Sequence, residues 1–146
     1  MSNYEIAAIT ISSISIVIAI ISFILSIVSN NRQRKISQGQ MEIQINQMIS
    51  NSKKELMDIS VLIGKENQEI LDQAFRTARE LNLNAYEEAC AKYIDNKVDK
   101  ERFKRNYYVE IRRLVEYKGN NEFLNPTTSP YKCILKVYEE WNNLER

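Results

Sequence analysis

The sequence predicts an all-α chain with an N-terminal transmembrane helix, a helical or coiled-coil connector and a small C-terminal helical bundle. Helix breakers are rare, since the 146 residues include 3 glycines and 2 prolines. One apolar run near the N-terminus is long enough to cross a bilayer. We therefore expect a transmembrane anchor over residues 1–29, a connector over 30–65 and a cytoplasmic helical domain over 66–146.

The segment from Ile6 to Val28 has no charged residue and is rich in isoleucine. As a helix rising ~1.5 Å per residue it spans roughly 34 Å, more than a hydrocarbon core of about 30 Å. The mean hydropathy of the chain is −0.41, so the remainder is too polar to enclose such a helix in a core. A cleaved signal peptide is disfavoured because Met1 to Glu5 lacks a positive residue and the apolar run is too long.

The charges on either side of this segment predict its orientation. Glu5 precedes it, whereas Arg32, Arg34 and Lys35 follow it. Because cytoplasmic flanks are enriched in Lys and Arg, we expect the N-terminus outside the cell membrane and the chain after the segment in the cytoplasm. The same three cations are candidate contacts for anionic lipid headgroups, although the topology signal explains them by itself.

Small residues form a stripe along the predicted membrane helix. Its members alternate at spacings of four and three residues and are Ala8, Ser12, Ser15, Ala19, Ser22, Ser26 and Ser29. Small side chains let helices approach closely and serine hydroxyls bond across the contact, so the stripe predicts a homo-oligomer with left-handed supercoiling. The alternative is that serine is merely tolerated there, with its hydroxyl bonded to its own helix. Ala7, Thr10 and Ser13 lie off the stripe.

The connector carries a degraded heptad pattern. Apolar residues recur every seven positions at Ile49, Leu56, Ile63 and Ile70, with Ile45 and Ile59 in the partner row. Ser52 and Glu66 interrupt that row, and Gly39 is a candidate break between the membrane helix and the connector. Two interpretations stay open: a short coiled coil, or an amphipathic helix that folds back on the following domain.

Two helices are expected in the first part of the C-terminal domain. The first is predicted over residues 70–81 from its apolar stripe. Asn84, followed three residues later by Glu87, then resembles a capping box, which predicts the start of a second helix. The connection between them is therefore expected just before Asn84.

Two further helices are expected in the second part of the domain. Asp99 is predicted to cap the third helix, and Gly119 is predicted to end it in a left-handed conformation. Ser129 followed by Pro130 predicts the start of the fourth, since proline is favoured in the first helical turn. Together the four helices would close a small bundle.

Several local motifs in this domain carry a resemblance. They are Leu83-Asn-Ala-Tyr-Glu-Glu-Ala-Cys90, Tyr93-Ile-Asp95, Val98-Asp99, Phe103 and Ile111 to Leu114. The chain over residues 67–146 resembles prokaryotic single-pass membrane proteins of unknown function, which pair an N-terminal membrane helix with a cytoplasmic helical domain. The resemblance implies a bacterial cell membrane, and it implies no activity, cofactor or catalytic residue.

The composition disfavours catalysis. The chain has no histidine, which removes the usual general base and the commonest metal ligand. Its two cysteines, Cys90 and Cys133, have no metal-ligand spacing, and a reducing cytoplasm would leave them as free thiols. There is no glycine-rich phosphate loop and no nucleophile elbow. We expect a protein that is not an enzyme and has no cofactor, metal site or catalytic residue.

A local excess of cations lies between Lys97 and Arg113. Its candidate members for an anionic-lipid patch are Lys100, Lys104, Arg105, Arg112 and Arg113. The alternative is an ordinary solvated helix face. Nucleic acid is disfavoured as a partner because the chain balances 20 basic against 19 acidic residues.

These observations favour a single-pass, membrane-anchored cytoplasmic helical interaction module of the scaffold or adaptor kind. It would self-associate, contact membrane lipid and bind an unidentified cytoplasmic protein. The alternative is a membrane-active effector, a small pore-forming or anti-phage type of protein, in which the serine stripes of several copies line a pore.

Overall fold

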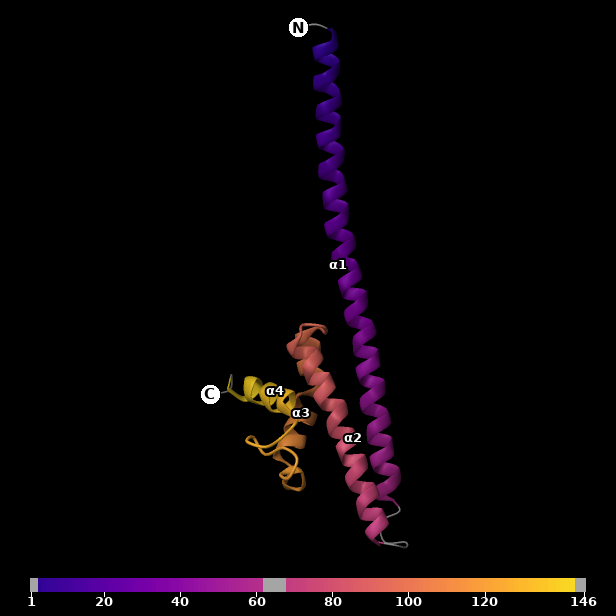
Figure 1. Cartoon of the computed structure of the whole chain (residues 1–146), viewed down its shortest axis with the longest axis vertical. Coiled ribbons are helices and arrows are strands. Elements are labelled where there is room, and N and C mark those ends of the chain that lie inside the picture. The colour runs from indigo at the N-terminus through magenta and orange to yellow at the C-terminus, as the bar shows by residue number, and fades with distance from the viewer. Residues whose placement is uncertain (1–2, 62–67, 144–146) are drawn as a thin grey trace. The chain divides into compact units, whose positions relative to one another are not determined.

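The computed structural model describes residues 3–61 and 68–143, and the regular elements in these ranges are all helical (Figure 1). The elements are α1 (Asn3–Ser60), α2 (Gln68–Ile94), α3 (Lys100–Glu116), the short 3-10 helix η1 (Lys118–Asn120) and α4 (Lys132–Asn143). The predicted all-α class is therefore confirmed. The chain divides into two compact units, Met1–Ser37 and Gln38–Arg146, so α1 contributes to both.

In the first unit, α1 is an exposed apolar helix. Between residues 14 and 28 its large apolar side chains are between 45% and 68% exposed, and they are Ile14, Ile16, Val17, Ile18, Ile20, Ile21, Phe23, Ile24, Leu25, Ile27 and Val28. Among the described residues, α1 is the helix that is long and apolar enough to cross a membrane by length and composition.

In the second unit, the remainder of α1 buries one stripe. Ile45, Ile49 and Ser52 are buried, and Leu56 and Ile59 are half-buried. The three- and four-residue spacing is that of an amphipathic helix facing a core. This packing favours the fold-back interpretation of the connector over a coiled coil. The compact unit begins at Gln38, whereas the sequence pattern placed the domain boundary at residues 65–66.

The other residues of the predicted connector follow the predicted pattern only in part. Gly39 does not break α1, which runs through it with open space around the glycine. Leu56 lies on the buried side of α1, as the heptad pattern predicts, whereas Ile70 is exposed on α2. Ile63, which continues the predicted heptad row, and Glu66, which interrupts the partner row, lie outside the described residues.

The centre of the second unit is aromatic. The Trp141 ring of α4 meets the Tyr93 ring of α2 edge-on at a centroid distance of 5.5 Å, and Phe103 of α3 lies 5.3 Å from Tyr93. The Trp141 Nε1–H donates to the Tyr93 hydroxyl at 3.1 Å, and that hydroxyl donates to Glu140 at 2.7 Å. The polar edges of the buried rings are thus satisfied while their faces fill the core.

The predicted break before Asn84 is wrong, because α2 is continuous from Gln68 to Ile94. Asn84 is exposed in mid-helix, while Leu83 and Tyr86 beside it are buried. A continuous helix places both of these side chains in the core, and this packing outweighs the local preference of Asn for a cap. The helix instead ends at Ile94, and two residues later Asn96 has a φ of 57° while Lys97 N–H bonds back to Lys92 O at 2.9 Å.

The predicted start of α3 is confirmed, whereas its predicted end is wrong. The Asp99 cap is confirmed, since its side chain accepts from Arg102 N–H at 3.0 Å. Gly119 is not a left-handed cap, because α3 already ends at Glu116 and Gly119 lies within η1. The Tyr117 ring lies so close to Gly119 that an added Cβ would be 2.4 Å from a ring carbon. Close approach of this ring therefore favours glycine there.

α4 begins at Lys132, two residues after Pro130, so the Ser129-Pro130 signal lies just ahead of the helix. Ser129 Oγ accepts from Tyr131 N–H at 3.0 Å. The Glu87 carboxylate of α2 accepts from Cys133 N–H at 2.8 Å and from Ile134 N–H at 2.9 Å. Glu87 therefore caps α4 from another helix, rather than closing a capping box in its own.

Candidate functional site

A groove of about 710 Å³ lies in the second unit where α1, α2, α3 and η1 approach one another. Its lining residues are Lys53, Leu56, Phe75, Arg79, Asn82, Leu83, Tyr86, Glu110, Arg113, Leu114, Glu116, Tyr117 and Asn120. Groups of three or more potential metal ligands are absent from the described part of the chain. The groove is therefore the candidate functional site.

The apolar part of the groove comes from three helices. Leu56 of α1, Phe75 and Leu83 of α2, and Leu114 of α3 all line it. Leu83 is fully buried, whereas the other three are half-buried and continue the core surface towards solvent. A mainly apolar lining with a few polar groups is typical of ligand-binding sites.

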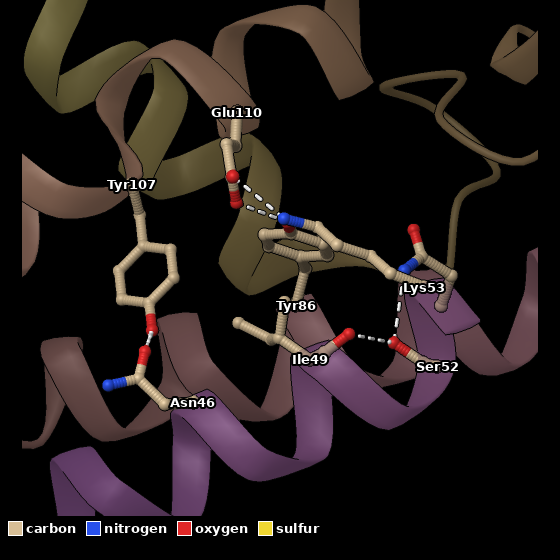
Figure 2. Close-up of polar contacts among 8 residues, drawn as sticks. Asn46, Ile49, Ser52, Lys53, Tyr86, Tyr107 and Glu110 are labelled. Carbon is tan, nitrogen blue, oxygen red and sulfur yellow. Dashed lines mark hydrogen bonds and ion pairs between the residues drawn. The ribbon is translucent and has the colours of Figure 1, made fainter.

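Glu110 of α3 joins three helices at one side of the groove (Figure 2). Its carboxylate accepts from Lys53 Nζ of α1 at 2.7 Å and from the Tyr86 hydroxyl of α2 at 2.5 Å. Partial burial acts to raise the pKa of Glu110, but the hydrogen bonds from Lys53 and Tyr86 outweigh it and lower that pKa. Burial, followed by the bond to Glu110, raises the pKa of Tyr86, so the pair is a carboxylate and a neutral phenol.

Two more polar contacts hold α1 against α2 and α3, and Figure 2 shows the one between Asn46 and Tyr107. The buried Asn82 Nδ2 of α2 donates to Ser52 Oγ at 3.0 Å, and Ser52 Oγ donates to Ile49 O at 2.9 Å. The Tyr107 hydroxyl of α3 donates to Asn46 Oδ1. Ser52 interrupts the apolar heptad because it is the hydrogen-bond partner of Asn82.

Two arginines add positive charge to the groove. Arg79 of α2 donates from Nη1 to Gly119 O at 2.8 Å, and its guanidinium lies 4.7 Å from the centre of the Phe75 ring and 5.9 Å from that of Tyr117. Arg113 of α3 is exposed, and its charge helps to lower the pKa of Glu110. Over residues 3–61 and 68–143, neither guanidinium lies within 4 Å of a carboxylate oxygen.

The predicted self-association stripe lies on α1 in the first unit. Ser12, Ser15, Ala19, Ser22 and Ser26 are all exposed there. Ala8 lies in the same helix, but its side chain is outside the described part. The predicted topology cations Arg32, Arg34 and Lys35 follow on the same helix and are exposed. Self-association through the stripe and contact of the three cations with lipid headgroups therefore stay predictions.

Three of the five cations in the predicted lipid patch have partners within the unit. Lys100 Nζ lies 4.8 Å from the centre of the Tyr93 ring, and Lys104 Nζ lies 6.0 Å from that of Trp141. Arg112 pairs with Glu116 at 2.9 Å. Arg105 is exposed on α3 without lining the groove, whereas Arg113 lines it. The five cations therefore have different surroundings, and lipid binding by them stays a prediction.

Both cysteines are free thiols. Burial is the main cause that raises the pKa of Cys90, which is fully buried. Burial, then the neighbouring Glu87 carboxylate, raises the pKa of Cys133 to about 11. Neither environment activates a thiolate nucleophile, which requires a lowered pKa.

Sequence reasoning missed most of the groove. Lys53, Tyr86 and Glu110 are distant along the chain, and each reads as an ordinary helix residue. One signal was present at Ser52, where a polar residue replaces an apolar one at a position the heptad assigns to the buried side. Such an interruption indicates a specific buried partner, although it does not identify Asn82.

Comparison with family models, curated proteins and solved structures finds no match to this chain. The class that its own features define is an all-helical protein with one long apolar N-terminal helix and a helical unit containing a charged, largely apolar groove. The resemblance to prokaryotic single-pass membrane proteins of unknown function stays a prediction from the sequence.

Proposed function

We propose that this protein is a single-pass membrane protein whose cytoplasmic helical unit binds another protein. The observation that carries the proposal is the apolar surface of α1 in the first unit, where each large side chain named above is at least 45% exposed. Monomeric soluble proteins rarely expose so long a contiguous apolar surface to water, because its hydration is unfavourable. Lipid covers such a surface without any partner helix.

The orientation in the proposal follows from the exposed cations Arg32, Arg34 and Lys35, which mark the cytoplasmic end of the apolar segment. The full-length chain is expected in the membrane fraction after an alkaline carbonate wash. A reporter active only in the cytoplasm, fused after Arg146, is expected to be active. Recovery in the aqueous fraction, or a reporter active only outside, would contradict the membrane location or the orientation respectively.

The binding role is supported by the groove of the second unit. It combines apolar side chains with fixed charges, the combination by which helical peptides are recognised in grooves. It contains no histidine, and its carboxylates are engaged in hydrogen bonds that hold the helices together. A binding surface accounts for these features with no catalytic step, and we propose that the protein is not an enzyme.

Self-association through the small-residue stripe is the second part of the proposal. Replacing Ser15, Ala19 and Ser22 by Ile widens the helix along one face only. Close packing through that face would be lost, so association in a membrane two-hybrid assay is expected to fall. The matched control replaces Ala7, Thr10 and Ser13 by Ile, off the stripe, and is expected to associate as the natural chain does. Equal association of both triple variants would exclude the stripe.

The same variants separate this proposal from a membrane-active effector. The proposed module leaves the membrane potential of expressing cells unchanged, as a potential-sensitive dye would show. Loss of potential with the natural chain, abolished in the stripe variant but retained in the control variant, would replace the proposal by a serine-lined pore.

A further inference from the structure

The acidic and basic side chains of the groove differ in whether they have partners of opposite charge. Its two carboxylates have internal partners: Glu110 is bonded by Lys53 and Tyr86, and Glu116 accepts from Arg112 at 2.9 Å and from the Tyr138 hydroxyl at 3.1 Å. Its two arginines lack carboxylate partners in the part of the chain that the structure describes. The charge that would complement the groove is therefore negative.

Arg79 is held in a fixed position. Its Nη1 donates to Gly119 O at 2.8 Å, and its guanidinium lies over the Phe75 ring at 4.7 Å. A guanidinium has five N–H donors, so this single backbone bond leaves further donors for a ligand. A planar guanidinium that is already positioned loses little conformational entropy when it binds a carboxylate. Arg79 therefore has the properties of a pre-organised anion contact.

Arg113 supplies the second positive charge from a different helix. It lies on α3 next to Leu114, which also lines the groove, so a cation and an apolar contact occur together. Phe75 and Arg79 provide the same combination on α2. A ligand that matches both walls needs an apolar face with acidic groups at its edge, and this pattern is that of an acidic amphipathic helix.

We propose that the groove binds an amphipathic helix of another protein, with Arg79 and Arg113 pairing with carboxylates that flank its apolar stripe. This inference rests on the proposed function and deepens it by naming the kind of partner. The groove is open to solvent and is lined by three long helices, which suits an extended helical ligand better than an enclosed small molecule. A single exposed ion pair contributes little, so the specificity would come from pairing beside desolvated apolar contacts.

The test uses the full-length chain in lipid nanodiscs and a displayed library of amphipathic helices. The library keeps a Leu stripe and varies the flanking positions among Asp, Glu, Lys and Gln. Binders are expected to be enriched in Asp and Glu, and Arg113→Gln is expected to weaken an enriched binder about tenfold. Arg105→Gln removes an exposed arginine of the same helix outside the groove and is expected to leave the affinity unchanged.

Charge reversal tests whether a loss of binding is caused by misfolding of the variant. Arg113→Glu is expected to lose the acidic binder and to regain binding when the paired acid is changed to Lys. Enriched helices without an acidic preference, or with equal affinity for the Arg113 and Arg105 variants, would overturn the acidic-partner inference while leaving protein binding intact. Arg-dependent binding of dodecanoate with no helix enriched would overturn it in favour of an anionic amphiphile and would also count against the proposed function.

Discussion

At the scale of single residues, Glu110 links three helices. Its carboxylate bonds Lys53 of α1 and Tyr86 of α2 from its own position on α3. The pKa of Glu110 is lower in the folded chain than in the unfolded one. Its negative charge therefore stabilises the folded state at pH values above the unfolded-state pKa of about 4.3. This stabilisation is lost as the pH falls through the folded-state pKa.

Glu110→Gln is expected to lower the free energy of unfolding at pH 7 by about 1 kcal/mol, a value reduced for the partial exposure of the pair. The difference from the natural chain should shrink when the pH falls below the unfolded-state pKa. Denaturant titrations at several pH values measure it. Glu139→Gln, an exposed acid on α4, is the control and should change little at any pH. A pH-independent effect of Glu110→Gln would contradict the role of its charge.

The cysteines give a second prediction at this scale. With the pKa of Cys133 raised to about 11, the thiol is protonated at pH 8 and should react slowly with iodoacetamide. Its reaction should accelerate as the pH approaches 11, whereas the fully buried Cys90 should react only on unfolding. Mass spectrometry of each site measures both rates. Rapid labelling of Cys133 at pH 8 in the folded chain would contradict the protected environment.

The sequence predicted single residues well only where the signal is local. Asp99 caps the helix that starts beside it, and its partner Arg102 is only three positions further along the chain. The partner of Glu110 on α1 is 57 residues away, and nothing near Glu110 indicates it. The charged groups of the groove therefore became visible only in the folded structure.

At the scale of elements, Glu87 shows why a correct local signal gave a wrong boundary. The sequence places Glu87 three residues after Asn84, as a capping box requires, yet both lie within α2. The carboxylate caps α4 instead, across the helix interface. A motif defined by spacing identifies an acceptor for helix amides, but it does not identify which helix supplies the amides.

Glu87→Ala is expected to destabilise the docking of α4 by about 1 to 2 kcal/mol, because two amides at the start of α4 lose their acceptor. Trp141, the single tryptophan of the chain, lies in α4, so its fluorescence during denaturation measures the loss of stability. Glu88→Ala is the matched control, since Glu88 pairs with Lys92 on the surface at 2.8 Å. Equal losses for the two variants would count against the inter-helix cap.

At the scale of the whole molecule, the apolar N-terminal helix was the easiest feature to predict, because it depends on composition over a long segment. The extent of the second unit was harder. The amphipathic stripe of residues 38–60 fits either a second chain or the chain's own bundle, and only tertiary packing distinguishes them. The boundary at Gln38 therefore required the structure.

This boundary predicts the behaviour of two fragments. Residues 38–146 should form a soluble helical unit without detergent, since the exposed apolar segment is removed. Residues 66–146 should be less stable by several kcal/mol, because they lack Ile45 and Ile49, each of which is at most 3% exposed. Circular dichroism during thermal unfolding compares them. Equal stability of the fragments would show that the α1 segment contributes nothing to the unit.

The buried hydrogen bond between Ser52 and Asn82 restricts how α1 could be exchanged between two copies of the protein. A slide of α1 by one turn would bury the Asn82 amide against an aliphatic neighbour and leave its hydrogens unpaired, which is costly in a core. The two helices therefore fit in one alignment. An α1 arm donated by a second copy of the protein would have to seat at the same position, so a swapped pair would rebuild the same groove twice.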